Sequence, residues 1–186
     1  MIRSLPWPLA VIDFEASSLE PSGYPIEVGL ALWDAPGEPI RSWSALIQPT
    51  TDWARQGHWS QQSAKVHGLR GRDLMAAGWR PDRIAPGLNR VLGPGRTVWC
   101  DGGPYDGQWM RGLFRAGGVD PVFMLDDWHR LAALMGKTSR ERALDWLERV
   151  RATHRARSDA EQLLLAMAHA LGIEAGCVED PDLLEV

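Results

Sequence analysis

The sequence has few of the residues that build disulfide or zinc scaffolds. Its 186 residues include two cysteines, Cys100 and Cys177, which lie far apart and form no Cys-x-x-Cys pair. We therefore expect neither a disulfide framework nor a structural zinc site, and a reducing, cytoplasmic location is the default. No run of about 18 apolar residues occurs, so a transmembrane helix and a membrane partner are not expected. The N-terminal segment also lacks the apolar core of a signal peptide.

An excess of positive charge is absent as well. The formal net charge is −4, which argues against a protein that holds long duplexes by electrostatic attraction alone. One segment departs from this balance, because residues 137–158 carry seven basic side chains against three acidic ones. A solvated helix surface explains such a segment, and a local rim that attracts phosphate groups is the alternative.

The pattern of apolar residues predicts an α/β domain. The chain is long enough to bury one substantial core. It shows neither internal repeats nor low-complexity segments. An antiparallel meander of three strands is followed by strands that alternate with helices, which favours a mixed five-stranded sheet flanked by helices. We expect one domain over residues 1–173 and a loosely held acidic tail over 174–186. Strands are expected at residues 9–15, 24–33, 40–49, 96–101 and 121–125, and helices at 61–68, 81–92, 104–117, 126–136, 139–150 and 159–171.

Two acids end the first strand, within the stretch "PLAVIDFEASSLEP". Side chains alternate along a strand, so Asp13 and Glu15 face the same side while Phe14 faces the other way, into the core. A solvated strand end would explain a lone Asp-x-Glu. A metal site would explain it too, and the choice depends on what other acids the fold brings to the same place.

Further acids stand at the starts of two predicted helices. Asp106 opens the helix after the fourth strand, and Asp159 lies just inside the last helix, where the helix dipole favours a negative charge. Four carboxylates that converged would repel one another and raise their pKa values unless cations neutralised them. His154 precedes Asp159 by five residues, and an imidazole can accept a proton from water near neutral pH.

Three segments in this order, "DFEASSL", "VWCDGGPYDGQWMRGLF" and "HRARSDA", resemble the motifs of the DEDD family of 3′–5′ exonucleases. This superfamily includes RNase T, oligoribonuclease and the proofreading subunits of polymerases, and the resemblance extends from about Ile12 to Leu171. It implies an RNase H-like exonuclease fold. The spacing of His154 and Asp159 resembles the histidine subclass, DEDDh, because the tyrosine subclass would carry its Tyr where this chain has Arg155.

The resemblance also implies roles for five residues. Two Mg²⁺ or Mn²⁺ ions would be held by four carboxylates, and His154 would act as the general base that deprotonates the attacking water. Asp13 would contact both ions. The four implied metal ligands are Asp13, Glu15, Asp106 and Asp159, and with His154 they form the implied catalytic set.

The substrate contacts depart from the family pattern. The usual Asp-x-Glu-Thr-Thr-Gly is replaced here, and we expect Ser17, Ser18 and Leu19, together with Tyr105, to lie near the terminal nucleotide. The segment "KVHGL" resembles a family "HGI" segment, so His67 is interpreted as a fold residue. His58 is interpreted as a structural or surface residue.

The resemblance implies a metal-dependent 3′–5′ exonuclease that releases nucleoside 5′-monophosphates. Its partner would be a nucleic acid 3′ end, single-stranded or in a short oligonucleotide, of DNA or RNA, and a homodimer is compatible with the family. Three alternatives stay open: an inactive domain of the same fold that binds nucleic acid or a protein, a metal phosphohydrolase for small molecules on an unrelated α/β fold, and a plain α/β protein with acids at favourable element ends.

Overall fold

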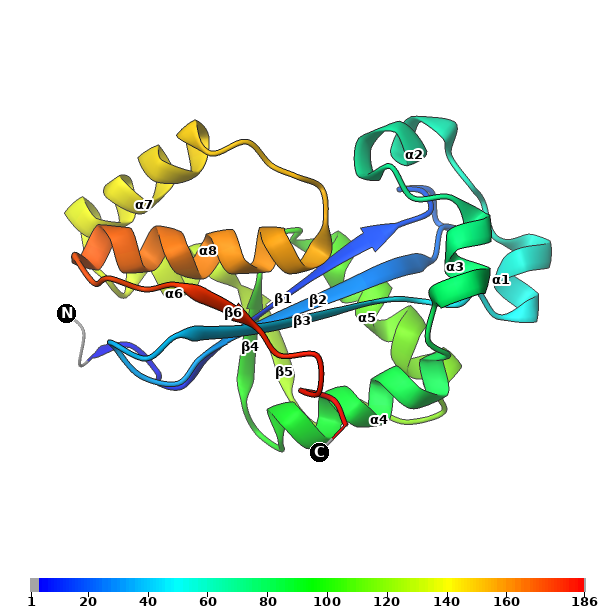
Figure 1. Ribbon diagram of the computed structural model, residues 1–186, viewed down its shortest axis with the longest axis horizontal. Helices are drawn as coiled ribbons and strands as arrows, with labels where there is room; N and C mark the ends of the chain where they lie inside the picture. Colours follow the sequence, from blue (N-terminus) through cyan, green and yellow to red (C-terminus); the bar gives the residue numbers. More distant parts are fainter. Residues whose placement is uncertain (1–3, 186) are drawn as a thin grey trace.

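A six-stranded mixed sheet lies between two layers of helices (Figure 1). The computed structural model describes residues 4–185. The strand order is β5-β4-β1-β2-β3-β6, in which β1, β2 and β3 form the antiparallel meander, and β4, β5 and β6 are joined by parallel pairing. This architecture confirms the predicted α/β fold with a mixed sheet. The strands are β1 (Leu9–Ala16), β2 (Pro25–Trp33), β3 (Ile40–Leu46), β4 (Thr97–Cys100), β5 (Met124–Asp127) and β6 (Cys177–Glu179).

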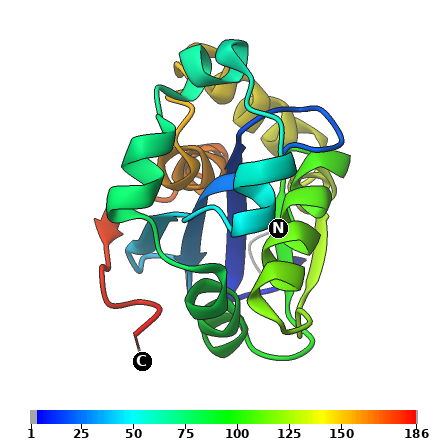
Figure 2. The same ribbon diagram turned by 90° about the vertical axis from the view of Figure 1, so that its right-hand side faces the viewer.

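The helices divide between the two faces of the sheet and one of its ends. Helices α4 and α5 cover one face, and α6, α7 and α8 cover the other. The short helices α1, α2 and α3 lie beyond the end of β1, the end that faces the viewer in Figure 2. The bounds are α1 (Thr51–Gln56), α2 (Gln61–His67), α3 (Gly71–Ala77), α4 (Pro81–Leu92), α5 (Pro104–Gly117), α6 (Trp128–Ala133), α7 (Lys137–Arg149) and α8 (Ala156–Leu171).

Alternation along β1 decides which layer each of its side chains meets. Ile12 and Phe14 belong to the core cluster that includes residues of α4 and α5, whereas Leu9 and Val11 belong to the cluster that includes residues of α6, α7 and α8. By the same period of two, Asp13 and Glu15 continue the row that faces α8. The acids at the strand end therefore point toward the side where α8 begins.

The C-terminal segment corrects the expectation of a loose tail. Strand β6 pairs in parallel with β3, with Ile40 opposite Cys177. Leu183 and Leu184 are buried, at 5% and 3% exposure, in the cluster that includes residues of α4. The sheet therefore has six strands and not five, because this short strand adds to the edge that the meander leaves open.

Three predicted helix starts are wrong. Helix α6 begins at Trp128 and not at 126, α7 at Lys137 and not at 139, and α8 at Ala156 and not at 159. The other three predicted starts are confirmed, and the Ser60 hydroxyl caps α2 by accepting the Ser63 N–H at 3.2 Å. Within residues 4–185 no helix has both the length and the apolar character that a membrane crossing requires.

Candidate active site and metal centre

A pocket of about 520 Å³ lies where β1 ends. Its wall contains the five residues that the motifs predicted as the catalytic set, and they come from three separate parts of the chain. Two come from β1, one from the first turn of α5, one from the segment before α8 and one from the first turn of α8. The residues are Asp13, Glu15, Asp106, His154 and Asp159.

The start of α8 reaches this pocket because β2 has a glycine beneath it. Gly29 is the strand partner of Asp13, and a Cβ atom on Gly29 would lie 2.1 Å from the backbone of Ala156. Any larger residue would push the first turn of α8 away from the sheet. The close approach therefore places Asp159, in that first turn, beside the acids of β1.

The ligand atoms form two clusters. In the first, Glu15, His154 and Asp159 each offer an atom within 4.8 Å of the others. In the second, Asp13, Asp101 and Asp106 each offer an atom within 4.8 Å of the others. Asp101 was not predicted, although it directly follows β4. The signal that would have indicated Asp101 is its place directly after a strand that pairs in parallel with β1, which also ends in acids.

Asp106 is held by the turn that precedes α5. Its side chain is 3% exposed, and Oδ2 accepts the Gly102 N–H at 2.9 Å. A Cβ on Gly102 would lie 2.5 Å from that carboxylate oxygen, so the turn requires glycine there. Burial raises the pKa of Asp106 to about 6, and the Gly102 N–H lowers it in part.

The two acids of β1 have strongly perturbed pKa values. Burial, followed by the charges of Asp106 and Glu15, raises the pKa of Asp13 well above its usual range. Burial, followed by the charges of Asp159 and Glu27, raises the pKa of Glu15 to about 8, and the Arg155 guanidinium opposes this rise. Repelling, partly buried carboxylates are unlike the solvated acids of a plain strand end.

These donor sets fit divalent cations. Closely spaced carboxylate oxygens are the ligands that Mg²⁺ and Mn²⁺ prefer, and a cation would remove the repulsion that raises the pKa values of Asp13 and Glu15. The first cluster would hold a cation through Glu15 and Asp159, and the second through Asp13 and Asp106, with Asp101 close by.

His154 sits on a short segment with an unusual backbone. Its φ is +52°, in the left-handed region that residues with a Cβ rarely adopt. On one side, the Thr153 N–H and hydroxyl donate to Asp159 Oδ1 at 3.3 and 3.2 Å. On the other side, Arg155 donates to both oxygens of the buried Glu27 at 3.0 and 2.7 Å.

Glu27 also accepts the Ala156 N–H at 3.2 Å. One buried carboxylate thus holds both the residue after His154 and the first residue of α8. The motifs predicted neither Glu27 nor Thr153 as part of the site, because Glu27 stands inside an apolar strand and Thr153 lies outside the motif positions.

Three of the four predicted substrate contacts line the pocket. Leu19 and Tyr105 are 64% and 44% exposed, and Ser18 lies beside them. Ser17 does not line it. Its buried hydroxyl donates to the His58 carbonyl at 2.8 Å and accepts the Tyr24 N–H at 3.0 Å, so Ser17 joins two loops of the wall.

Two histidines that the motifs set aside also line the pocket. His58 Nδ1 hydrogen-bonds Ser18 Oγ at 2.8 Å. His67 Nδ1 accepts the Leu69 N–H at 3.0 Å, which leaves the ring proton on Nε2. This buried Nε2 has no hydrogen-bond partner among the residues that the structure describes. Burial lowers the pKa of His67, which favours the neutral ring.

Comparison with solved structures identifies the fold. Exonuclease I of E. coli, solved in complex with a dA16 oligonucleotide, matches with a TM-score of 0.65 and 13% identity over 87% of this chain and 40% of that one. Exonuclease I from Methylocaldum szegediense matches with a TM-score of 0.63 and 15% identity over 88% and 40%. A structure of apo exonuclease I matches with a TM-score of 0.66 and 14% identity over 96% and 44%.

The chain therefore has the RNase H-like fold of exonuclease I and spans less than half the length of those proteins. At these identities the likeness concerns the fold. No model of a known protein family matches the sequence, and no curated protein matches it.

Proposed function

We propose that the protein is a metal-dependent 3′–5′ exonuclease of the DEDDh type, which hydrolyses terminal phosphodiester bonds and releases nucleoside 5′-monophosphates. The observation that carries the proposal is the convergence of Asp13, Glu15, Asp106, His154 and Asp159 in one pocket of an exonuclease fold. The acids are partly or fully buried and repel one another, a costly arrangement that a cation-binding function explains.

The carboxylates would hold two divalent cations, Mg²⁺ or Mn²⁺. When bound, such ions stabilise the negative charge that develops on the phosphate during hydrolysis. Asp13 belongs to the second cluster, and Glu15 of the first cluster follows two residues later on the same face of β1. Asp13 is therefore the carboxylate that would contact both ions.

His154 accepts the proton of the attacking water. The side chain is exposed on the rim of the pocket, within 4.8 Å of the carboxylates of Glu15 and Asp159. Exposure lets the imidazole pass the proton on to solvent. The contacts of Thr153 and Arg155 on either side hold the segment that carries the ring.

The rest of the pocket binds the terminal nucleotide. The exposed side chains of Leu19 and Tyr105 offer apolar surface to the last base. The unpartnered His67 Nε2–H donates to an oxygen of the nucleotide, since a buried donor without a partner is otherwise costly. The volume of about 520 Å³ suits one nucleotide.

The partner in this proposal is a single strand or a short oligonucleotide. Solved neighbours of this fold were crystallised with single-stranded oligonucleotides, and the net charge of −4 disfavours long duplexes. A homodimer and a cytoplasmic location belong to the same proposal, on the family resemblance and the two unpaired cysteines.

The test is degradation of 5′-labelled single strands of DNA and RNA in the presence of Mg²⁺ or Mn²⁺. We expect a ladder that shortens from the 3′ end, release of nucleoside 5′-monophosphates, and no reaction in a chelator. Equal rates for the wild type and Asp13→Asn would contradict the proposal. Binding of the strands without any cleavage would instead support an inactive domain of the same fold.

A further inference from the structure

A second pocket, of about 370 Å³, adjoins the active-site pocket. The loop between β1 and β2 separates the two: Ser18 to Glu20 line the first pocket, and Pro21 to Gly23 line the second. The buried Trp109 of α5 lines both. A chain that leaves the active site along α5 would therefore enter the second pocket next.

Polar and aromatic side chains follow one line along α5 between the two pockets. Tyr105 lines the active-site pocket, and Gln108, Arg111 and Arg115 line the second. Their spacing of three, three and four residues keeps them on one face of the helix. From Asp106 the helix rises by about 7.5 Å to Arg111 and by about 13.5 Å to Arg115.

The two arginines of this line have no ion-pair partner among residues 4–185. Both are exposed, and Asp52 is the one acid among the residues that line the pocket. Some other exposed arginines are paired, as Arg80 is with Asp82 at 2.6 Å. Two unpaired guanidinium groups, one helical turn apart, are suited to two nearby phosphate groups of one strand.

The opposite wall of the second pocket is aromatic. Tyr24 stacks on Trp53 with the ring centroids 5.6 Å apart and an interplanar angle of 9°. Tyr24 is buried, whereas Trp53 is half-buried and contributes to the pocket wall. Cationic groups on one wall and an aromatic side chain on the other are the combination that proteins use for single-stranded nucleic acids.

We propose that the second pocket binds the sugar-phosphate backbone upstream of the 3′-terminal nucleotide, through Arg111 and Arg115. A stacked strand advances by about 3.4 Å per nucleotide. The rise along α5 then places the contacts about two to four nucleotides from the scissile end. This assignment rests on the proposed exonuclease function, and it makes substrate length a determinant of activity.

The test compares the double variant Arg111→Ala/Arg115→Ala with the wild type on oligothymidylates and oligouridylates of two and of about eight nucleotides. The variant should lower kcat/KM for the longer strand about 10-fold and leave the dinucleotide within about twofold. For the longer strand, the slope of log(kcat/KM) against log[salt] should become shallower by about 1.4, because each lost phosphate contact to a single strand reduces this slope by about 0.7.

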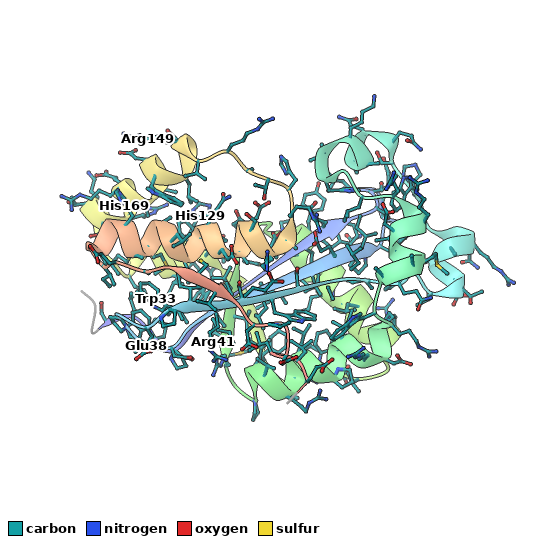
Figure 3. All side chains as sticks on the ribbon, in the orientation of Figure 1. Trp33, Glu38, Arg41, His129, Arg149 and His169 are labelled. Atoms are coloured by element: carbon teal, nitrogen blue, oxygen red, sulfur yellow. The ribbon has the colours of Figure 1, made fainter. Side chains whose placement is uncertain are left out.

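Two control variants separate this surface from general charge effects. Arg111→Lys/Arg115→Lys keeps the charge and should retain most of the salt dependence. Arg142→Ala/Arg149→Ala removes two exposed arginines of the basic α7 segment, on the other face of the sheet (Arg149 is labelled in Figure 3), and should leave kcat/KM unchanged.

If Arg111→Ala/Arg115→Ala had the same kcat/KM as the wild type on the longer strand, the inference would be overturned and the exonuclease proposal would stand. If kcat/KM on the longer strand fell only in Arg142→Ala/Arg149→Ala, the inference would be overturned and the basic α7 segment would be the binding surface. Absence of cleavage of every strand by the wild-type protein would refute the exonuclease proposal and, with it, this inference.

Discussion

The two halves of the candidate site are built in opposite ways. The half made by Asp13, Asp101 and Asp106 lies against a sheet strand and a helix start, where Asp13 follows fully buried strand residues and Asp106 is itself buried. The other half carries His154 on an exposed segment without regular secondary structure. A cation site needs fixed ligands in a dry environment, whereas a proton acceptor must exchange its proton with water.

The segment that carries His154 depends on side-chain hydrogen bonds, whereas Asp106 is fixed by burial together with the Gly102 N–H. His154 keeps its left-handed backbone because Glu27 holds Arg155 and Ala156 while Asp159 holds Thr153. The contrast predicts that changes in the acidic half remove metal binding and activity together. Changes at His154, or at the residues that hold its segment, should reduce activity while cations still bind.

The largest effect is expected for Asp13→Asn. The substitution removes the carboxylate that supports both clusters, so hydrolysis should slow by about 10³-fold or more. Calorimetric titration with Mn²⁺ should show loss of binding, and the circular dichroism spectrum should stay unchanged because Asn has the same shape. Retained Mn²⁺ affinity would show that Asp13 is not a central ligand.

His154→Ala should slow hydrolysis by about 10²-fold, the usual contribution of a general base. Mn²⁺ binding should survive, because Glu15 and Asp159 remain in the cluster. The same calorimetric titration, with His129→Ala as a matched control outside the pocket, checks this. If Mn²⁺ binding fell in His154→Ala, the residue would be a ligand and not the base.

Glu27→Gln tests the support of the His154 segment. The amide cannot accept from Arg155 at both positions and from Ala156, so the segment should loosen and kcat should fall about 10-fold with little change in KM. Arg155→Lys, which keeps a charge but loses the two-pronged contact, should give a smaller loss. Steady-state kinetics with Mn²⁺ calorimetry measure both variants, and unchanged kcat in Glu27→Gln would exclude a positioning role.

The same contrast explains what the sequence could predict. Local patterns indicated β1 and its two acids, because an apolar run that ends in Asp-x-Glu is visible along the chain. The order of three short motifs indicated Asp106, His154 and Asp159, and the fold brings all five into one pocket.

Features that depend on pairing between distant segments were missed. Glu27 lies opposite Glu15 only because of the register of β1 with β2. Asp101 meets Asp13 only because β4 pairs with β1. Strand β6 has only three residues, too few to show an alternating apolar pattern along the sequence. It forms because it pairs with the edge strand β3.

The smallest effect concerns the stability of the metal-free protein, and it tests whether Glu15, in the half that carries His154, is destabilised by its neighbours. The pKa of Glu15 is about 8 in the fold against an ordinary value of 4.5. A carboxyl whose pKa is raised on folding contributes stability at low pH and loses it as pH rises from 4.5 toward 8. Glu15→Gln removes that loss, so the variant should exceed the wild type in stability at pH 8.

At pH 4.5 the two proteins should unfold alike. The gain at pH 8 should be about 1–2 kcal/mol, less than the full shift implies because solvent screens the partly exposed side chain. Thermal unfolding in chelator at both pH values measures this difference. Added Mn²⁺ should then raise the Tm of the wild type more than that of Glu15→Gln, because only the wild type keeps the ligand. Equal unfolding of both proteins at pH 8 in chelator would mean that Glu15 is not strained by its neighbours.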